Sequence, residues 1–371
     1  MNPFSYGTIV KNEHFFDRHE ECSKIVSTLA NGNNIVLFAP RRYGKTSLVF
    51  KVIEELESKN ILCIYFDFMP VFSIESFVVN YLEAIKKKQT NIQNFIQTFT
   101  EVIRNIRPKL TFDMSGNPEF GIDLMEQSIS SQTLSEVLDL PQKLSQKGKH
   151  IVVVFDEFQE ITKFEKFSFE SLLRSKIQQQ NVNYLFLGSK THLLNEMFNN
   201  KKRAFYNSAS HIQLNTLPRE ETVSYIQRQF KGSGININRE NSILLIDEAA
   251  DIPYYIQFLA AEVWQFVINS VHEVNSEIIK ICSNKIIEYK QDYYFELFDR
   301  QSVLQKKILK ALVISGENIF STQYSQQFRL SAASSIQKAI LVLMENGLID
   351  KTQNTYFISD PFFKRYIQNY A

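Results

Sequence analysis

The chain has 371 residues, of which 44% are hydrophobic and 22% are charged, and its formal net charge is +1. This composition is normal for soluble globular proteins, and the length predicts two or three domains of about 150 residues each. The near-zero net charge does not indicate a polyanionic partner, and no apolar run approaches the ~20 residues of a membrane-spanning helix.

The three cysteines also exclude some classes of protein. Cys22, Cys63 and Cys282 lie far apart, with neither the spacing of a zinc site nor the even number of a disulfide framework. We expect buried thiols in a reducing compartment. The segment Met1–Gly7 shows no signal-peptide pattern, so we expect a cytoplasmic protein.

The first informative segment is an apolar run followed by a tight loop. Ile35 to Phe38 predict a buried strand, and the apolar residues at helical spacing from Leu48 to Leu56 predict an amphipathic helix. Between them, Ala39 to Thr46 match the Walker A pattern G-x-x-x-x-G-K-[ST], with Ala39 in place of the first glycine. A methyl group is tolerated at that position if φ stays negative.

This context predicts the phosphate-binding loop of a nucleoside triphosphatase. Backbone N–H groups would hold the phosphates, Lys45 would reach the outer ones, and the Thr46 hydroxyl would face Mg²⁺. The expected nucleotide-binding residues are Ala39, Pro40, Arg41, Arg42, Tyr43, Gly44, Lys45, Thr46 and Ser47. The alternative is a chance Gly-Lys-Thr in a surface turn, against which the flanking strand and helix argue.

Farther along, Ile61–Phe68 reads as a second strand, and helical patterns run from Ile74 to Ile106. The segment 109–124 alternates polar and apolar residues around Ser115-Gly116-Asn117-Pro118. Such alternation around a turn predicts a β-hairpin. We assign no chemistry to this insertion.

The run Ile151–Phe155 predicts a strand buried on both faces, as parallel sheets require. Asp156 and Glu157 follow it in Walker B fashion, at the strand end where open α/β sheets bind ligands. Asp156 would hold Mg²⁺, and Glu157 would orient the attacking water and accept its proton. Taken alone, the acidic pair could be a solvated strand end.

A third apolar strand, from Tyr184 to Leu187, ends at Gly188-Ser189. Ser189 is our candidate for a polar contact to the γ-phosphate or the water, and a simple turn serine is the alternative. From Leu217 to about Tyr294 helical spacing dominates, which predicts a helical lid domain that Pro218 opens at the first turn of a helix.

The C-terminal region predicts a winged helix: a helix over Val303–Val313, a short helix after Thr322, a helix capped by Ser331 or Ser334, a hairpin, and a final helix capped by Asp360. Residues 301–371 carry eight Lys or Arg and four Asp or Glu, a net +4. The expected recognition helix has one cation, Lys338, whereas specific DNA binders bring several to the phosphates. This favours a protein-contact or structural module and leaves DNA binding open.

With these motifs, the chain resembles the archaeal-type ATPases of the STAND class within the AAA+-like P-loop superfamily. Seven strings carry the resemblance: N-P-F-x-Y-G (Asn2–Gly7), F-x-x-R-x-x-E (Phe15–Glu21), P-R-R-x-G-K-T-S-L (Pro40–Leu48), D-E-F-Q (Asp156–Gln159), G-S (Gly188–Ser189), I-P-Y-Y-I-Q (Ile252–Gln257) and S-D-P-F-F (Ser359–Phe363). The resemblance implies ATP and Mg²⁺ binding, slow hydrolysis and use as a conformational switch. It places the segment around Arg18 near the nucleotide base and Pro253 at the start of the lid helix.

One departure concerns an arginine. Family members often show P-L-Y-G-R after the Gly-Ser strand, but here Ser208 stands where the arginine would be, with Arg203 or Lys202 as substitutes. An arginine finger is worth ~10³–10⁵ in rate, so its loss favours a slow switch over a motor.

The sequence therefore predicts an α/β P-loop NTPase core with a parallel sheet sandwiched by helices (1–216, with the hairpin insertion at about 109–124). An all-α lid (217–298) and a winged helix (299–371) follow. We expect an ATP- and Mg²⁺-dependent switch in signalling or defence with an unknown protein partner, either as a monomer or as an oligomer. Two alternatives stay open: an ATP-gated DNA-binding protein, and a non-hydrolysing sensor that retains ADP.

Overall fold

The computed structural model describes residues 2–8, 18–89, 92–103, 106–112, 118–123, 129–146, 148–164, 166–269, 272–352 and 355–371. Phe15–Asp17 and the predicted turn residues Ser115–Asn117 lie outside these ranges. The chain groups into two compact units, which we call the helical unit (Met1–Arg18, Pro40–Ser47, Asn215–Ala371) and the sheet unit (His19–Ala39, Leu48–Leu214). Each is described by itself.

Five parallel strands form the sheet of the sheet unit, in the order β2-β5-β6-β1-β7. Their bounds are β1 Ile35–Phe38, β2 Leu62–Asp67, β5 Ile151–Asp156, β6 Asn183–Gly188 and β7 Ser210–Gln213. Every residue of β1, β5 and β6 is buried, as parallel strands covered on both faces require. The predicted α/β fold class is confirmed. The short edge strand β7, S-H-I-Q, has no pattern that predicts it.

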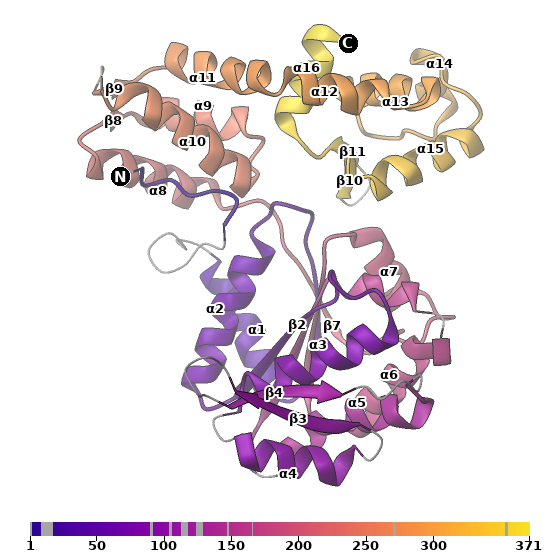
Figure 1. The fold of residues 1–371 in the computed structure, drawn as a ribbon. Coiled ribbons are helices and arrows are strands. Elements are labelled where there is room, and N and C mark those ends of the chain that lie inside the picture. The colour runs from indigo at the N-terminus through magenta and orange to yellow at the C-terminus, as the bar shows by residue number, and fades with distance from the viewer. Residues whose placement is uncertain are drawn as a thin grey trace. The chain divides into compact units, whose positions relative to one another are not determined.

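Helices cover both faces of this sheet. In Figure 1, α1 and α2 lie on one side and α3, α5 and α6 on the other. The bounds are α1 His19–Ala30, α2 Lys45–Ser58, α3 Ile74–Lys86, α4 Ile92–Val102, α5 Ser131–Ser145, α6 Phe169–Gln179 and α7 Thr191–Asn199, with 3₁₀ segments η2 Phe158–Lys163 and η3 Lys166–Ser168. Antiparallel strands β3 Arg107–Phe112 and β4 Pro118–Asp123 pair where the sequence predicts a hairpin.

Aromatic side chains fill the core on the α3 side of the sheet. The Phe155 and Phe158 rings stack at 5.9 Å, and Phe158 also meets Phe186 at 4.6 Å. All three side chains are fully buried, and large aromatic rings contribute strongly to core stability. Phe158 opens η2 directly after Glu157, so this packing fixes the turn that follows β5.

The helical unit contains the predicted helical and winged-helix segments. Its helices are α8 Arg219–Gly232, α9 Arg239–Glu248, α10 Pro253–Val267, α11 Ser276–Tyr289, α12 Gln291–Asp299, α13 Val303–Ile314, α14 Thr322–Gln327, α15 Ala333–Glu345 and α16 Pro361–Tyr370. Its strands are β8 Asn236–Ile237 paired with β9 Glu273–Val274, and the wing β10 Ile349–Thr352 paired with β11 Thr355–Ile358. In the described ranges, no helix is both long and apolar enough to cross a bilayer.

Two details differ from the sequence expectation. The N-cap of α15 is Ala332, which makes no side-chain cap bond, so neither Ser331 nor Ser334 caps this helix. Strands β8 and β9, of two residues each, pair within a segment expected to be purely helical. The sequence did not predict them, because strands this short show no periodicity. Asp360 caps α16 as predicted, accepting hydrogen bonds from the Phe362 and Phe363 amides.

The N-terminal string N-P-F-x-Y-G packs on the helical unit. Phe4 is buried against Phe230 of α8 at 4.8 Å, and the Tyr6 ring meets Phe258 of α10 at 4.8 Å. The Asn2 amide donates to the Ala261 carbonyl at 3.1 Å. These aromatic residues therefore anchor the first segment to α8 and α10.

Candidate nucleotide site

The carboxyl ends of four strands meet at one edge of the sheet. The register pairs Phe38 with Gly188, Phe155 with Phe186, and Asp67 with Asp156. Strand β6 thus lies between β1 and β5, and the chain leaves this edge at Ala39, Glu157 and Ser189. Parallel sheets bind ligands beyond this end of their strands, so the predicted residues that follow β1, β5 and β6 start from a common edge.

The Walker A loop has the backbone of an anion cradle. Arg42 and Gly44 both take left-handed conformations, with φ of 71° and 79°. Such residues alternating with ordinary ones turn successive N–H groups toward one point, which favours an anion. Lys45 begins α2 and is buried, and Thr46 is the next residue. A Cβ at Gly44 would touch nothing within 4 Å, so its glycine is needed for φ and not for space.

Arg42 is held in this unusual conformation by the helical unit, to which the loop belongs. Its guanidinium lies over the Tyr254 and Tyr255 rings, 5.0 and 4.8 Å from their centroids. It also lies 3.4 Å from Asp360 Oδ2. The Arg42 carbonyl accepts a hydrogen bond from the Tyr254 amide at 3.3 Å. A non-glycine residue at positive φ costs about 1–3 kcal/mol and persists only when its surroundings hold it.

Arg18 and Pro253, which the family resemblance places beside the nucleotide, both lie in the helical unit. The Arg18 guanidinium donates to the Tyr43 carbonyl at 3.2 Å and to the Asn215 carbonyl at 2.7 Å. It therefore ties the loop to the start of the C-terminal part of the chain. Pro253 is the first residue of α10, as predicted, and its contact with a nucleotide base stays a prediction.

Asp156 is buried, and each of its carboxylate oxygens accepts a hydrogen bond from a neighbour. Its Oδ2 accepts a hydrogen bond from the Tyr65 hydroxyl at 2.8 Å, and its Oδ1 accepts one from the Glu157 amide at 2.8 Å. Burial and the negative charge of Asp156 raise the pKa of Tyr65 well above its usual range, so the phenol stays a donor. Sequence analysis did not identify Tyr65 as a site residue. The one feature that could have drawn attention to its strand is that β2, like β5, ends in an aspartate, Asp67.

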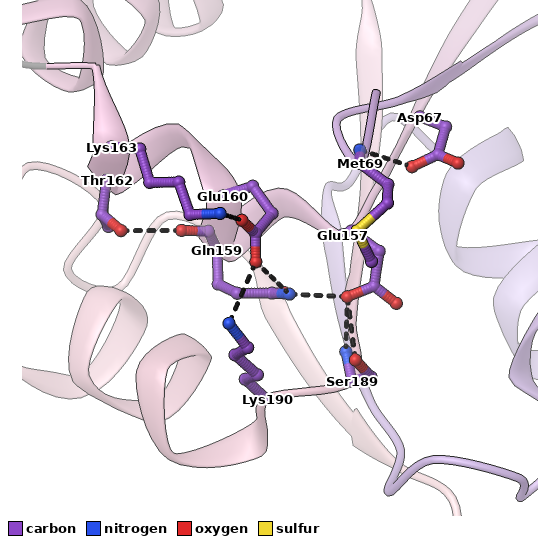
Figure 2. A network of polar contacts seen from close by, with 9 residues as sticks. All are labelled: Asp67, Met69, Glu157, Gln159, Glu160, Thr162, Lys163, Ser189 and Lys190. Carbon is purple, nitrogen blue, oxygen red and sulfur yellow. Dashed lines mark hydrogen bonds and ion pairs between the residues drawn. The ribbon is translucent and has the colours of Figure 1, made fainter. Parts of the chain in front are cut away.

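Glu157 sits in a strained conformation at the end of β5, with φ 49° and ψ 42°. Its Oε2 accepts hydrogen bonds from the Ser189 hydroxyl at 2.8 Å, the Ser189 amide at 3.3 Å and Gln159 Nε2 at 2.5 Å (Figure 2). The structure thus brings together Glu157 and Ser189, two of the residues predicted to act in hydrolysis. Gln159 was not among them, although it belongs to the D-E-F-Q string.

A second layer of charges supports Gln159 (Figure 2). Glu160 is buried and pairs with Lys163 and with Lys190, the latter at 3.2 Å. Burial raises the pKa of Glu160, but the two ammonium groups outweigh it and hold that pKa below its ordinary value. Glu160 therefore stays ionised next to the Gln159 amide, whose Nε2 lies 3.5 Å from Glu160 Oε1.

The two candidate substitutes for the missing arginine lie in the sheet unit. The Arg203 guanidinium grips Glu170 through two hydrogen bonds of 3.2 and 2.6 Å and reaches Glu196 at 3.3 Å. Bidentate carboxylate pairs of this kind are strong, so Arg203 would have to leave them to contact a phosphate. Lys202 is exposed, and the Ser208 hydroxyl donates to the Phe205 carbonyl.

Two family models match parts of the chain. Residues 15–185 match a family model described as an ATPase domain predominantly from Archaea, and residues 269–369 match a probable winged helix domain. The chain carries an archaeal-type ATPase domain followed by a winged-helix domain. The ATPase match contains the Walker A loop and the Asp156–Glu157 pair, and it ends within β6.

Solved structures share this fold over almost the whole chain. The Walker-type ATPase PABY2304 of Pyrococcus abyssi is 16% identical, with 99% of each chain covered and a TM-score of 0.67. The ORC2 protein of Aeropyrum pernix, solved as ADPNP–ADP complexes, is 12% identical, with 98% of each chain covered and a TM-score of 0.56. No curated protein matches the chain. At these identities the similarity shows the fold, and the STAND assignment stays a prediction.

Proposed function

We propose that this protein is a slow, Mg²⁺-dependent ATPase that works as a conformational switch, with domains bounded at 1–216, 217–298 and 299–371. The observation that carries the proposal is that the Walker A loop belongs to the helical unit. Within that unit, Arg42 of the loop contacts Tyr254, Tyr255 and Asp360. The ATPase domain and the ADPNP–ADP complexes of the Aeropyrum pernix relative support adenine nucleotide as the ligand.

The residues present fit ATP and a magnesium ion. The cradle at Arg42–Gly44 and the buried Lys45 suit the β- and γ-phosphates, because backbone N–H groups and an ammonium both stabilise negative charge. Thr46 and Asp156 offer the oxygen ligands that Mg²⁺ prefers, with water and phosphate oxygens completing its shell. When bound, Mg²⁺ would neutralise charge that develops on the phosphates. The described residues contain no group of three His, Cys, Asp or Glu that could hold a metal by itself.

For hydrolysis we propose that Glu157 orients a water molecule and accepts its proton. Carboxylates act as general bases when they are held within hydrogen-bond reach of the water. Ser189 donates to the same carboxylate at 2.8 Å, and we propose that it also contacts the γ-phosphate or the water. With Arg203 engaged by Glu170 and Glu196, turnover should be slow.

Asp360 is the residue that would carry the switch to the winged helix. Its Oδ1 caps α16 by accepting from the Phe362 and Phe363 amides at 2.9 and 3.2 Å. Its Oδ2 accepts from the Tyr294 hydroxyl at 3.2 Å and from Arg42 at 3.4 Å. An anion in the loop competes with Asp360 for the Arg42 charge. Nucleotide occupancy therefore changes what holds the last helix in place.

The test combines a turnover variant with a readout on α16. Glu157→Gln should keep ATP affinity and lose phosphate release, since the amide cannot accept the proton. In this trapped form, hydrogen exchange of α16 should rise on adding ATP and should not rise in Asp360→Asn, which lacks the ion pair. Full turnover by Glu157→Gln would show that Glu157 is not the general base. Unchanged hydrogen exchange of α16 on adding ATP would show that nucleotide binding does not act as the proposed switch.

A second candidate, an ATP-gated DNA-binding protein, is favoured by the winged-helix match and by the net +4 of residues 301–371. A mobility-shift titration with and without ATP decides between the two, because phosphate contacts make DNA binding strongly salt-dependent. An ADP-retaining sensor is a third form of the same site. Mass spectrometry of the denatured protein would show the retained nucleotide. A pull-down with Glu157→Gln would identify the protein partner, in signalling, defence or another process.

A further inference from the structure

We propose that Gln159 is a positioning residue that sets the orientation of the Glu157 carboxylate for hydrolysis. This inference rests on the proposed ATPase function. Three features of the described residues carry it. Gln159 Nε2 makes a short hydrogen bond to Glu157, Gln159 Oε1 is buried without a hydrogen-bond partner, and the surroundings allow the amide one orientation.

The hydrogen bond is direct and shielded from solvent. Gln159 is 1% exposed, and its Nε2 lies 2.5 Å from Glu157 Oε2. The Ser189 hydroxyl donates to the same oxygen at 2.8 Å (Figure 2). Two donors from different segments, η2 and the end of β6, therefore converge on one carboxylate oxygen. Such an arrangement defines the plane of the carboxylate, because rotation about its terminal bond would break both bonds.

The side-chain oxygen of Gln159 indicates that this glutamine does not serve to stabilise the fold. Its Oε1 is buried and has no hydrogen-bond partner among the described residues. A buried acceptor without a partner lowers stability, and an apolar side chain of the same shape would avoid that loss. Retaining glutamine is therefore best explained by what its Nε2 does for Glu157.

The surroundings leave the amide little choice of position. A Cβ built at Gly188 would lie 2.0 Å from Gln159 Oε1 and 3.2 Å from its Cδ, so the side chain occupies the space that the missing Cβ of Gly188 leaves. The backbone carbonyl of Gln159 accepts a hydrogen bond from the Thr162 hydroxyl at 2.8 Å, which holds the main chain of this turn. Turning the amide over would direct Oε1 at the Glu157 and Glu160 carboxylates, which repel it.

The test is Gln159→Met, which keeps the length and the packing of the side chain and removes the donor. Losing a hydrogen bond to a charged catalytic group should lower kcat by about 10–100-fold. ATP affinity and KM should stay within about twofold. The matched control is Gln257→Met in α10. Gln257 is also buried, donates to the Tyr225 hydroxyl at 3.1 Å and has an Oε1 without a partner in the described residues. The control should leave kcat unchanged.

Epistasis separates positioning from a general structural effect. If Gln159 acts through Glu157, then adding Gln159→Met to Glu157→Gln should cause no further loss of residual turnover. An independent multiplicative loss in the double variant, or wild-type kcat in Gln159→Met, would overturn the inference and leave the ATPase function standing. Wild-type protein that hydrolyses no ATP would instead overturn the proposed function, and this inference with it.

Discussion

Gly188→Ala tests the tightest packing contact at the end of β6. An added Cβ would lie 2.0 Å from Gln159 Oε1 and 2.7 Å from Leu194 Cδ1, whereas ordinary contacts begin near 3.4 Å. The backbone of Gly188 is outside the left-handed region, so alanine suits the conformation and only the space is missing. The substitution therefore displaces the Gln159 amide or the Leu194 side chain.

The magnitude follows from these two clashes. Overpacking a core costs about 1–3 kcal/mol, and replacing glycine in a permitted conformation returns about 0.4–1 kcal/mol through the unfolded chain. We expect a net loss of about 1–2 kcal/mol in the free energy of unfolding. If Gln159 moves away from Glu157, kcat should also fall by about 10–100-fold, as a lost hydrogen bond to a charged group predicts.

Urea unfolding and phosphate release measure the two effects separately. A second-site variant sharpens the result. Gly188→Ala combined with Gln159→Ala removes the clash with Gln159 and leaves only the one with Leu194, so stability should recover in part while turnover stays low. Wild-type stability and wild-type kcat in the single variant would refute the reasoning, because they would show that the space beside Gly188 is not filled. Recovery of kcat in the double variant would show that the Gln159 donor is unnecessary.

Three further predictions concern the loop, the cap of α16 and the thiols. Lys45→Ala should weaken ATP binding by ~100-fold or more, because the phosphates lose a charge-assisted partner; calorimetry with ATP and Mg²⁺ measures this, and unchanged affinity would contradict it. Asp360→Ala should destabilise the helical unit by about 1–2 kcal/mol, but Asp360→Asn by less than about 1 kcal/mol, because asparagine keeps the cap and loses only a partly exposed ion pair; equal melting shifts would show that the cap contributes nothing. Burial raises the thiol pKa to about 12, 12 and 11 for Cys22, Cys63 and Cys282, and a nearby carboxylate adds to the rise at each thiol. An alkylating reagent at pH 8 should therefore modify the native protein far more slowly than the protein in urea, since the thiolate is the reactive form, and equal rates would place the thiols at the surface.

Local patterns were enough to predict the elements that carry the ATPase domain. Neighbouring residues are enough to predict the buried runs at β1, β5 and β6 and the Gly44-Lys45-Thr46 loop before an amphipathic helix. The same holds for the wing ahead of α16 in the C-terminal domain. Burial on both faces of a strand and the 3.6-residue period of a helix are local constraints, so the chain shows them without its fold. The edge strand β7 was not predicted, because it pairs only with β1 within the sheet and its four residues need no alternation of apolar and polar side chains.

Tertiary structure alone decided which side chains contact the acidic pair, and which contact the Walker A loop. Tyr65 meets Asp156 because β2 pairs with β5, Gln159 reaches Glu157 because a 3₁₀ turn folds it back beside Gly188, and Arg42 meets Asp360 across 318 residues of chain. These contacts depend on register, turn geometry and the packing of distant helices, none of which leaves a periodic trace. The sequence by itself determined which residues are candidates for a nucleotide site, and the fold decided which neighbouring side chains contact them.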